Sequence, residues 1–345
     1  MSEGLDIRGV RTVKTIQKPS DGPKQIHRTA QYVAVNDQKK DLVVAMADMA
    51  IFSNRGYKIT DDHVDGKQIR AAKWTVIDAN WDPRVIHILA RAALQRKSLV
   101  AFEPVSVQKS ARLFNARFQE NSVEKLACDI YPHNKVNLAS PNKYELAAMH
   151  AEAKGNGLME KDDWWRVVDA MGIPSSGARD RFVQLTNSKM ADEGIPVQAI
   201  QLLPFIPIIL TKLGSEGVLH TELLKHDDPR LTDPVAAPYI LSRCANGTEE
   251  IGGVYMRLFP AVEVVEDVVS VNGVGDTFLG VLIAGLASGW KLDEDLIHAA
   301  QRGAVMTLRS SKSVSLKVHN LLSEHRYTKQ KLEQDTDDIL DYYHA

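Results

Sequence analysis

The residues best placed to do chemistry lie in the run 270–278 (SVNGVGDTF), where two glycines and a carboxylate precede an apolar stretch. Gly273 and Gly275 have no Cβ, so successive backbone amides, with that of Val274 between them, can turn toward one oxyanion. Asp276 follows directly and can accept a proton from a substrate hydroxyl while the amides stabilise charge on a transferring phosphoryl group. A purely structural alternative is a glycine-rich turn in which Asp276 caps a helix.

The segments on either side of this run must position it. Residues 266–271 (EDVVSV) predict a short buried strand, and residues 277–290 (TFLGVLIAGLASGW) are apolar on nearly every side, as in a helix buried against a sheet. A helix that begins here would add the positive end of its dipole to the amides. The run is therefore predicted to be a strand-to-helix junction that binds an anion beside a carboxylate.

A second pair with chemical potential is Asn142 and Glu145, three residues apart at the predicted start of a helix (SPNKYELAAM, residues 140–149). This spacing puts both side chains on one helix face, about one turn apart. An amide and a carboxylate so placed can organise a hydrated Mg²⁺, reached by Glu145 through water, and the phosphates that it bridges. The structural alternative is a helix cap, with Asn142 as the capping residue and Glu145 near the positive end of the dipole.

A third motif follows the predicted buried strand 204–211 (PFIPIILT). Lys212, Gly214 and Gly217 form a turn that could place backbone amides or the lysine near nucleotide phosphates. A two-glycine turn at a strand end explains the same residues.

Further polar residues are predicted on the same rim. Asp78 and Asn80 end one strand, and Glu103 with Pro104 ends the next, so these residues could line the substrate side or simply form turns. Asp48 follows a hairpin strand and could contact a sugar hydroxyl if a small sheet closes as a lid.

The wider pattern predicts an α/β fold. Residues 29–35 (TAQYVAV) and 42–46 (LVVAM) indicate a β-hairpin with one exposed face, whereas residues 74–105 read as strand, helix and strand, which is a parallel βαβ unit. We therefore expect an open, mostly parallel sheet with helices on both faces, plus a small β lid. Ligands of such sheets bind beyond the carboxyl ends of the strands, where the three motifs would meet.

We divide the chain into a polar segment (1–27), a lid hairpin region (28–60), an α/β domain (61–325) and a C-terminal helical tail (326–345). The net charge of -2 gives no electrostatic reason to expect nucleic acid or an anionic membrane as a partner. Two distant cysteines indicate neither a disulfide framework nor a zinc site, and the eleven histidines show no metal-ligand spacing. Without a long apolar segment or an apolar leader, the chain is expected in the cytoplasm.

Together the motifs resemble those of the ribokinase-like carbohydrate and nucleoside kinases, also called the phosphofructokinase B family. That family has an N-x-x-E motif, a T-K-x-G-x-x-G type turn and a late D-T-x-G-A-G-D signature, and counterparts occur here in the same order. The runs FEPVSVQKSARLF, QLLPFIPIILTKLGSEGV and AQRGAVMTLRS look most like the eukaryotic pseudouridine kinase branch. The resemblance covers about residues 29–315.

The resemblance implies transfer of the γ-phosphoryl group of ATP to the 5'-hydroxyl of pseudouridine or a related nucleoside or sugar. It assigns the base to Asp276 and the anion hole to the amides of Gly273, Val274 and Gly275. The nucleotide and Mg²⁺ would be bound by Asn142, Glu145, Lys212, Gly214, Gly217 and Gln301, and the acceptor by Asp48, Asp78 and Asn80. It also implies a homodimer through the lid sheet, a link to pseudouridine-5'-phosphate glycosidase, and a monovalent cation.

The chain departs from the family pattern in two places. Ser270 and Val271 replace the first Asp and Thr of the late signature. The family's first strand, with its sugar-contacting Asp, and its G-G-x-x-x-N segment have no counterpart here, so half of the sugar site is expected to be absent and a sheet edge uncovered. Two alternatives follow: a nucleotide-binding relic or regulatory module without catalysis, and a kinase for another sugar such as ribose.

Overall fold

The computed structural model describes residue 10 and residues 29–37, 42–53, 72–115, 128–174, 176–244 and 250–321. Apart from residue 10, the expected polar segment 1–27 lies outside the described residues, as does the expected helical tail 326–345. In the described part of the chain, no helix is both long and apolar enough to cross a membrane.

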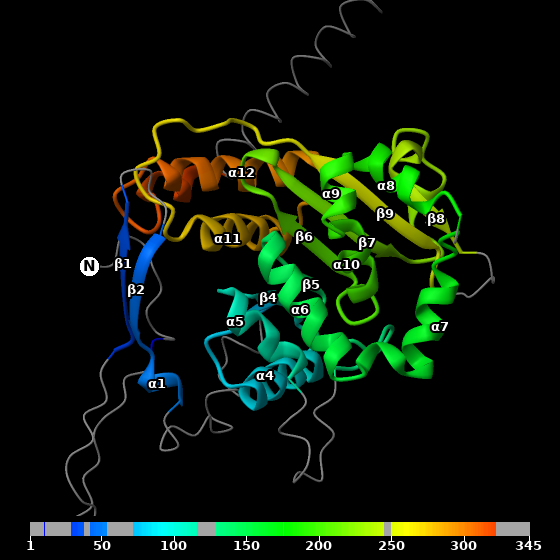
Figure 1. The fold of residues 1–345 in the computed structure, drawn as a ribbon, viewed down its shortest axis with the longest axis horizontal. Coiled ribbons are helices and arrows are strands. Elements are labelled where there is room, and N and C mark those ends of the chain that lie inside the picture. The colour runs from blue at the N-terminus through cyan, green and yellow to red at the C-terminus, as the bar shows by residue number, and fades with distance from the viewer. Residues whose placement is uncertain are drawn as a thin grey trace, which may run out of the picture.

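The core of the fold is a seven-stranded mixed sheet in the order β3-β4-β5-β6-β7-β9-β8 (Figure 1). Strands β3 to β6 pair in parallel, and the pairs β6–β7, β7–β9 and β9–β8 are antiparallel. Because β9 is antiparallel to β7 and β7 to β6, β9 points the same way as β3 to β6, and the predicted mostly parallel α/β class is confirmed. The strands span Trp74–Asp78 (β3), Leu99–Glu103 (β4), Leu138–Ala139 (β5), Ile208–Lys212 (β6), Val218–Leu224 (β7), Ile240–Arg243 (β8) and Gly253–Phe259 (β9).

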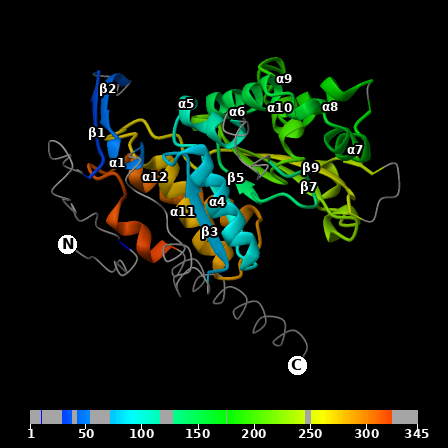
Figure 2. The ribbon, with the colours of Figure 1, turned by 90° about the horizontal axis from the view of Figure 1, so that it is seen from below.

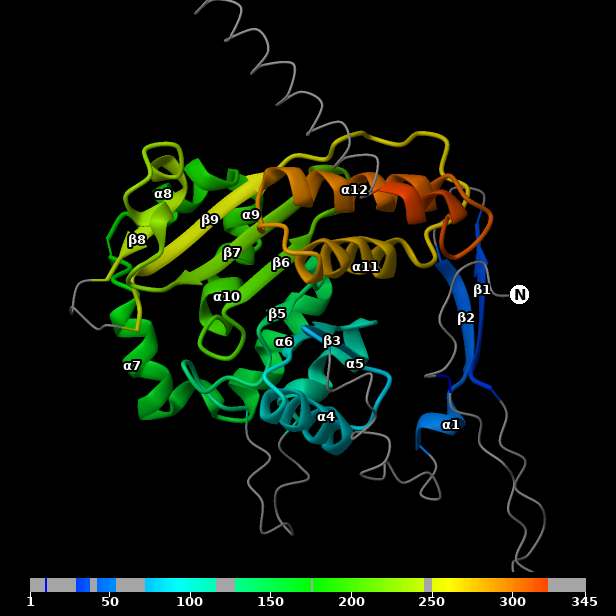
Figure 3. The ribbon, with the colours of Figure 1, turned by 180° about the vertical axis from the view of Figure 1, so that it is seen from behind.

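Alternation along the strands feeds two hydrophobic cores, one on each face of the sheet. In β4, Val100 and Phe102 belong to one core and Ala101, between them, to the other. The first core takes residues from α4 (Pro83–Gln95), α6 (Lys143–Gly155), α7 (Asp162–Ala170), α8 (Ala178–Leu185), α9 (Ser188–Asp192) and α10 (Ile195–Leu202). The second takes them from α11 (Val274–Ala287) and α12 (Glu294–Leu308), which run side by side (Figure 3).

The predicted hairpin exists, but neither of its faces is covered. β1 (Gln31–Asn36) and β2 (Leu42–Asp48) pair antiparallel in a separate sheet that stands away from the main one (Figure 2). The neighbours Tyr32 and Val33 point to opposite faces, yet each is 52% exposed. The expectation of one exposed face was therefore wrong. The hairpin is attached through α1 (Ala50–Ser53), where Phe52 packs edge-on against Trp81 with ring centroids 5.1 Å apart.

The strand predicted at residues 266–271 does not form. Val269 and Val271 are each 46% exposed, and the segment is irregular. Its amides at Val269 and Ser270 donate to the carbonyl of Leu308 at the end of α12 instead of pairing with a strand. The valines indicated β structure, but no neighbouring strand edge among the described residues is there to pair with them.

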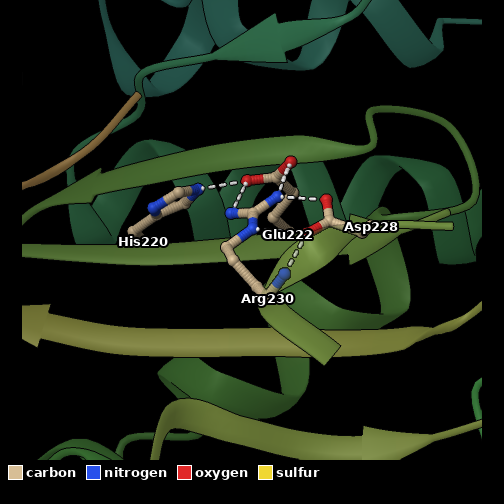
Figure 4. A network of polar contacts seen from close by, with 4 residues as sticks. All are labelled: His220, Glu222, Asp228 and Arg230. Carbon is tan, nitrogen blue, oxygen red and sulfur yellow. Dashed lines mark hydrogen bonds and ion pairs between the residues drawn. The ribbon is translucent and has the colours of Figure 1, made fainter. Parts of the chain in front are cut away.

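A charged network fixes the segment that follows β7 (Figure 4). Arg230 donates to both carboxylate oxygens of Glu222 at 2.7 and 2.8 Å, and also contacts Asp228. His220 Nε2 lies 2.8 Å from Glu222. Burial alone would raise the pKa of Glu222, but the hydrogen bonds from Arg230 and His220 outweigh it and lower the pKa to about 2.

Candidate active site

Chain-distant polar residues line up along the carboxyl edge of the parallel strands. Asp78 at the end of β3 lies in register beside Glu103 at the end of β4. Farther along the edge, Asn142 forms a parallel bridge with Lys212 at the end of β6. The Lys212 amine also lies against Gly275 in α11. The edge thus brings together three groups of residues that the sequence predicted to meet.

The start of α11 requires glycine and leaves its amides open. Gly273 has φ 73°, and a Cβ there would lie 1.8 Å from the carbonyl oxygen of Ser313. Among the described residues, the amides of Gly273, Val274 and Gly275 find no hydrogen-bond acceptor. Open amides at the positive end of a 14-residue helix form a site suited to an anion.

Asp276 does not cap the helix. Gly273 occupies the capping position without a side-chain hydrogen bond, and Asp276 is the third residue of α11. Its carboxylate belongs to an exposed residue and makes no hydrogen bond or ion pair with any described residue. Asp276 therefore makes no capping hydrogen bond with its side chain, and it stands as the acid in the first turn of α11, beside the amides.

A buried ion pair stands next to this helix end. The Lys212 amine is 3.4 Å from each carboxylate oxygen of Glu103, and the two side chains are 17% and 7% exposed. A Cβ on residue 275 would lie 2.9 Å from the same amine. Burial, opposed by the charge of Lys212 and helped by the nearby acids Asp276 and Glu145, raises the pKa of Glu103 to about 7.

The turn that follows Glu103 is strained. Val105 has φ 66°, a left-handed conformation that is an outlier for a β-branched residue and costs on the order of 1–3 kcal/mol. Its amide donates to Glu103 Oε1 at 3.3 Å. Ser106 then caps the short helix α5 (Val107–Ser110). Strain of this kind persists where the surroundings hold it, and it marks the turn as a candidate functional element.

At the β3 end of the rim, Asp78 and Asn80 join a cluster with two cations. Asn80 donates through its backbone and side chain to Asp78 at 2.9 and 3.2 Å. The Lys109 amine donates to Asn80 Oδ1 at 2.6 Å, and Arg112 donates to three carbonyls, those of residues 79–81. Burial and the charge of Arg112 lower the pKa of Lys109, against the effect of Asp78.

Glu103 was predicted only as a rim residue that could line the substrate side or form a turn, and Lys109 and Arg112 were not among the predicted site residues. Their signal was available in the run FEPVSVQKSARLF, which places charged residues directly after a strand. Asp48, which was predicted, is exposed on the hairpin. It lies shortly before Phe52, which packs on Trp81 next to Asn80, so it belongs to the attached end of the hairpin.

Asn142 and Glu145 do form a helix cap. Asn142 Oδ1 accepts from the amides of Tyr144 and Glu145, and Glu145 Oε2 accepts from the Asn142 amide at 2.8 Å. Glu145 Oε1 accepts no hydrogen bond from the described part of the chain. No cluster of three or more His, Cys, Asp or Glu in that part could hold a metal ion by itself. The donor set therefore fits Mg²⁺ only as an ion bound mainly by water and phosphate oxygens.

A cleft of about 590 Å³ lies between residues 260–263 and α12, and two further residues that were expected to bind the nucleotide, Gln301 and Gly217, lie behind its wall. Gln301 does not line it but supports its wall, because its side chain accepts from the Val262 amide at 2.9 Å and donates to the Phe259 carbonyl. Gly217 passes under the same wall, where a Cβ would lie 2.0 Å from the Phe259 oxygen. Gly214 turns the chain between Lys212 and Gly217 with φ 62°.

Fold and site together define an α/β protein in which a carboxylate and a lysine meet the open amides of a helix end. The sequence is 29% identical over 298 residues to the pseudouridine-metabolizing bifunctional protein of Schizosaccharomyces pombe. This relative confirms the resemblance that the sequence motifs indicated. The match covers 85% of this chain and 35% of that protein, so the chain spans about a third of its relative.

Solved structures and family models complete the comparison. The ribokinase of Arabidopsis thaliana complexed with ribose and ATP is similar with a TM-score of 0.49 and 13% identity, over 85% of this chain and 69% of that one. The ribokinase of Thermotoga maritima has a TM-score of 0.47 and 14% identity, over 86% of this chain and 70% of that one. The nucleoside kinase of Burkholderia thailandensis in complex with inosine has a TM-score of 0.45 and 10% identity, over 87% of this chain and 68% of that one. No family model matches.

Proposed function

We propose that this chain is an ATP-dependent kinase that phosphorylates the 5'-hydroxyl of pseudouridine or of a related nucleoside or sugar. The observation that carries the proposal is the Asp276 carboxylate at the start of α11, which lies beside the Lys212 amine and beside amides that, like the carboxylate, have no partner among the described residues. The pseudouridine-metabolizing relative supports the choice of acceptor.

In the proposed reaction, Asp276 accepts the proton of the acceptor hydroxyl as its oxygen forms a bond to the γ-phosphorus. The bond between that phosphorus and the β–γ bridging oxygen breaks, and ADP leaves. The amides of Gly273, Val274 and Gly275 and the Lys212 amine stabilise negative charge on the transferred group. Phosphoryl transfer needs mainly positioning and charge stabilisation, which these groups supply.

The other residues bind and orient. The cleft beside α12 would take the nucleotide, and Asp78, Asn80 and Asp48 would face the acceptor. Asn142 and Glu145 would approach Mg²⁺ through water; when bound, the ion neutralises phosphate charge. A monovalent cation near the anion pocket and a dimer through the hairpin belong to the same proposal. So does a functional link to pseudouridine-5'-phosphate glycosidase, which would consume the product.

The test is phosphorylation of pseudouridine by the purified chain with Mg·ATP, followed as nucleoside 5'-phosphate by chromatography, with uridine and ribose as alternative acceptors. We expect Asp276→Asn to lower kcat by about 10³-fold, because it removes the base, with little change in the Kd for Mg·ATP. Asp192→Asn, in a surface ion pair with Arg179, is the matched control. Intact Mg·ATP binding without product from any acceptor would refute the kinase and favour a nucleotide-binding module.

A further inference from the structure

The Lys212 amine occupies an electrostatically costly position. It lies against Gly275 at the positive end of the α11 dipole, where a cation is disfavoured and an anion favoured. The Glu103 carboxylate, with both oxygens at 3.4 Å, is its ion-pair partner. A lysine held at the amides of a helix end converges with them on one point, which is where an oxyanion would bind.

Glu103 is itself held in place from two directions. The strained turn at Val105 donates its amide to Glu103 Oε1, and register with Asp78 fixes the strand end. The ionisable groups that face Glu103 are Lys212 from β6, Asp276 from α11 and Glu145 from α6. Lys212 is the cation among these groups, and its amine lies 3.4 Å from the Glu103 carboxylate.

We propose that Glu103 is a positioning residue that fixes the Lys212 amine at the start of α11, so that Lys212 meets the transferred phosphoryl group. Glu103 acts through Lys212 and does not touch the nucleotide. This inference rests on the proposed kinase function. It gives the strained turn a role, because the left-handed Val105 sets the direction of the Glu103 side chain.

The test is a double-mutant cycle of Glu103→Gln and Lys212→Met, read as kcat and as the Kd for Mg·ATP. Lys212→Met is expected to lower kcat by about 10²-fold, as for loss of one oxyanion donor. Glu103→Gln should lower kcat by about 10-fold through misplacement of the amine. It should not weaken Mg·ATP binding, because glutamine adds no negative charge near the phosphates. In the Lys212→Met background, Glu103→Gln should cause no further loss of kcat.

Losses in kcat that multiply in the double variant would overturn the proposal, since Glu103 would then act independently of Lys212. Val105→Gly is a second variant that keeps the carboxylate and suits the positive φ. Because glycine loosens the turn that directs Glu103, Val105→Gly should lower kcat several-fold when Lys212 is present. In the Lys212→Met background, it should leave kcat unchanged. Asp192→Asn serves again as the control, with kcat unchanged.

The ammonium signal of Lys212 in ¹⁵N-lysine NMR separates this inference from the kinase proposal, because it needs no turnover. We expect the signal, assigned by its loss in Lys212→Met, to shift in Glu103→Gln and on addition of Mg·ATP to the wild type. If no product forms but both shifts occur, Glu103 still positions the Lys212 amine at a phosphate site, and the kinase proposal falls. A signal that Glu103→Gln leaves unmoved overturns the positioning role, whether or not product forms.

Discussion

At the scale of single residues, the molecule keeps one histidine neutral in its core. His87 in α4 is 3% exposed, and its Nε2 has no hydrogen-bond partner among the described residues. Burial lowers its pKa from 6.5 to about 4, helped by Lys135 and Arg91 and opposed by a backbone hydrogen bond to Leu113 and by Asp129. Protonation of this ring must therefore be coupled to unfolding.

The sign of this coupling gives a prediction. Because the pKa of His87 is lower in the folded chain, its contribution to stability is complete above about pH 6.5 and is lost as pH falls toward 4. The shift corresponds to about 3 kcal/mol. We expect His87→Leu to flatten the fall in the free energy of unfolding between pH 6.5 and 4.5, measured with urea. The exposed His133→Leu should keep the wild-type slope, and parallel curves for His87→Leu would contradict the assignment.

Residue types alone could not settle every role at the site. Asp276, Lys212 and the Asn142–Glu145 pair were found from their positions after predicted strands. The sequence left open whether Asp276 and Asn142 cap helices, and the structure answers differently for the two: Asn142 caps α6, whereas Asp276 caps nothing. The pairing of Glu103 with Lys212 joins positions 109 residues apart, which no local pattern encodes.

At the scale of elements, the pattern of apolar residues predicted the helices and strands that are buried in the fold. The βαβ unit was recognised from its apolar spacing, the helix α11 from a run that is apolar on nearly every side, and the turn after β6 from its two glycines. The pattern failed where β-type residues have no partner strand, as in residues 266–271, and where both hairpin faces stay exposed. A strand forms only beside a neighbouring strand, and the residues of the strand itself do not specify that neighbour.

The network after β7 supports a prediction at this scale. Arg230→Met should lower the free energy of unfolding by about 3 kcal/mol, at the lower end for buried pairs because the Arg230 side chain is 24% exposed. The loss would come mainly from the Glu222 charge left behind, so adding Glu222→Gln should recover more than half of it. Urea unfolding at pH 7 measures both. A double variant no more stable than Arg230→Met would mean that the network's hydrogen bonds, not the stranded charge, carry the stability.

At the scale of the whole molecule, the hairpin of β1 and β2 is the part whose stability the fold does not explain. A two-stranded sheet is marginally stable alone, and this one is joined to the main domain by the contact of Phe52 with Trp81. It lies on the side of the molecule where α11 begins (Figures 1 and 3). Its exposed apolar residues, each at least 48% accessible, are Tyr32, Val33, Val35, Val43, Val44 and Met46.

An apolar sheet exposed on both faces suits a second copy of the chain, because two hairpins can cover each other and pair their edges. We therefore expect a homodimer at micromolar concentration, measured by sedimentation velocity. Val33→Lys combined with Val44→Lys places a charge on each strand and should shift the dimer to monomer. Val235→Lys, at a valine 76% exposed outside the hairpin, should leave it a dimer. A monomeric wild type would contradict pairing through the hairpin, and a dimer that survives the double substitution would place the interface elsewhere.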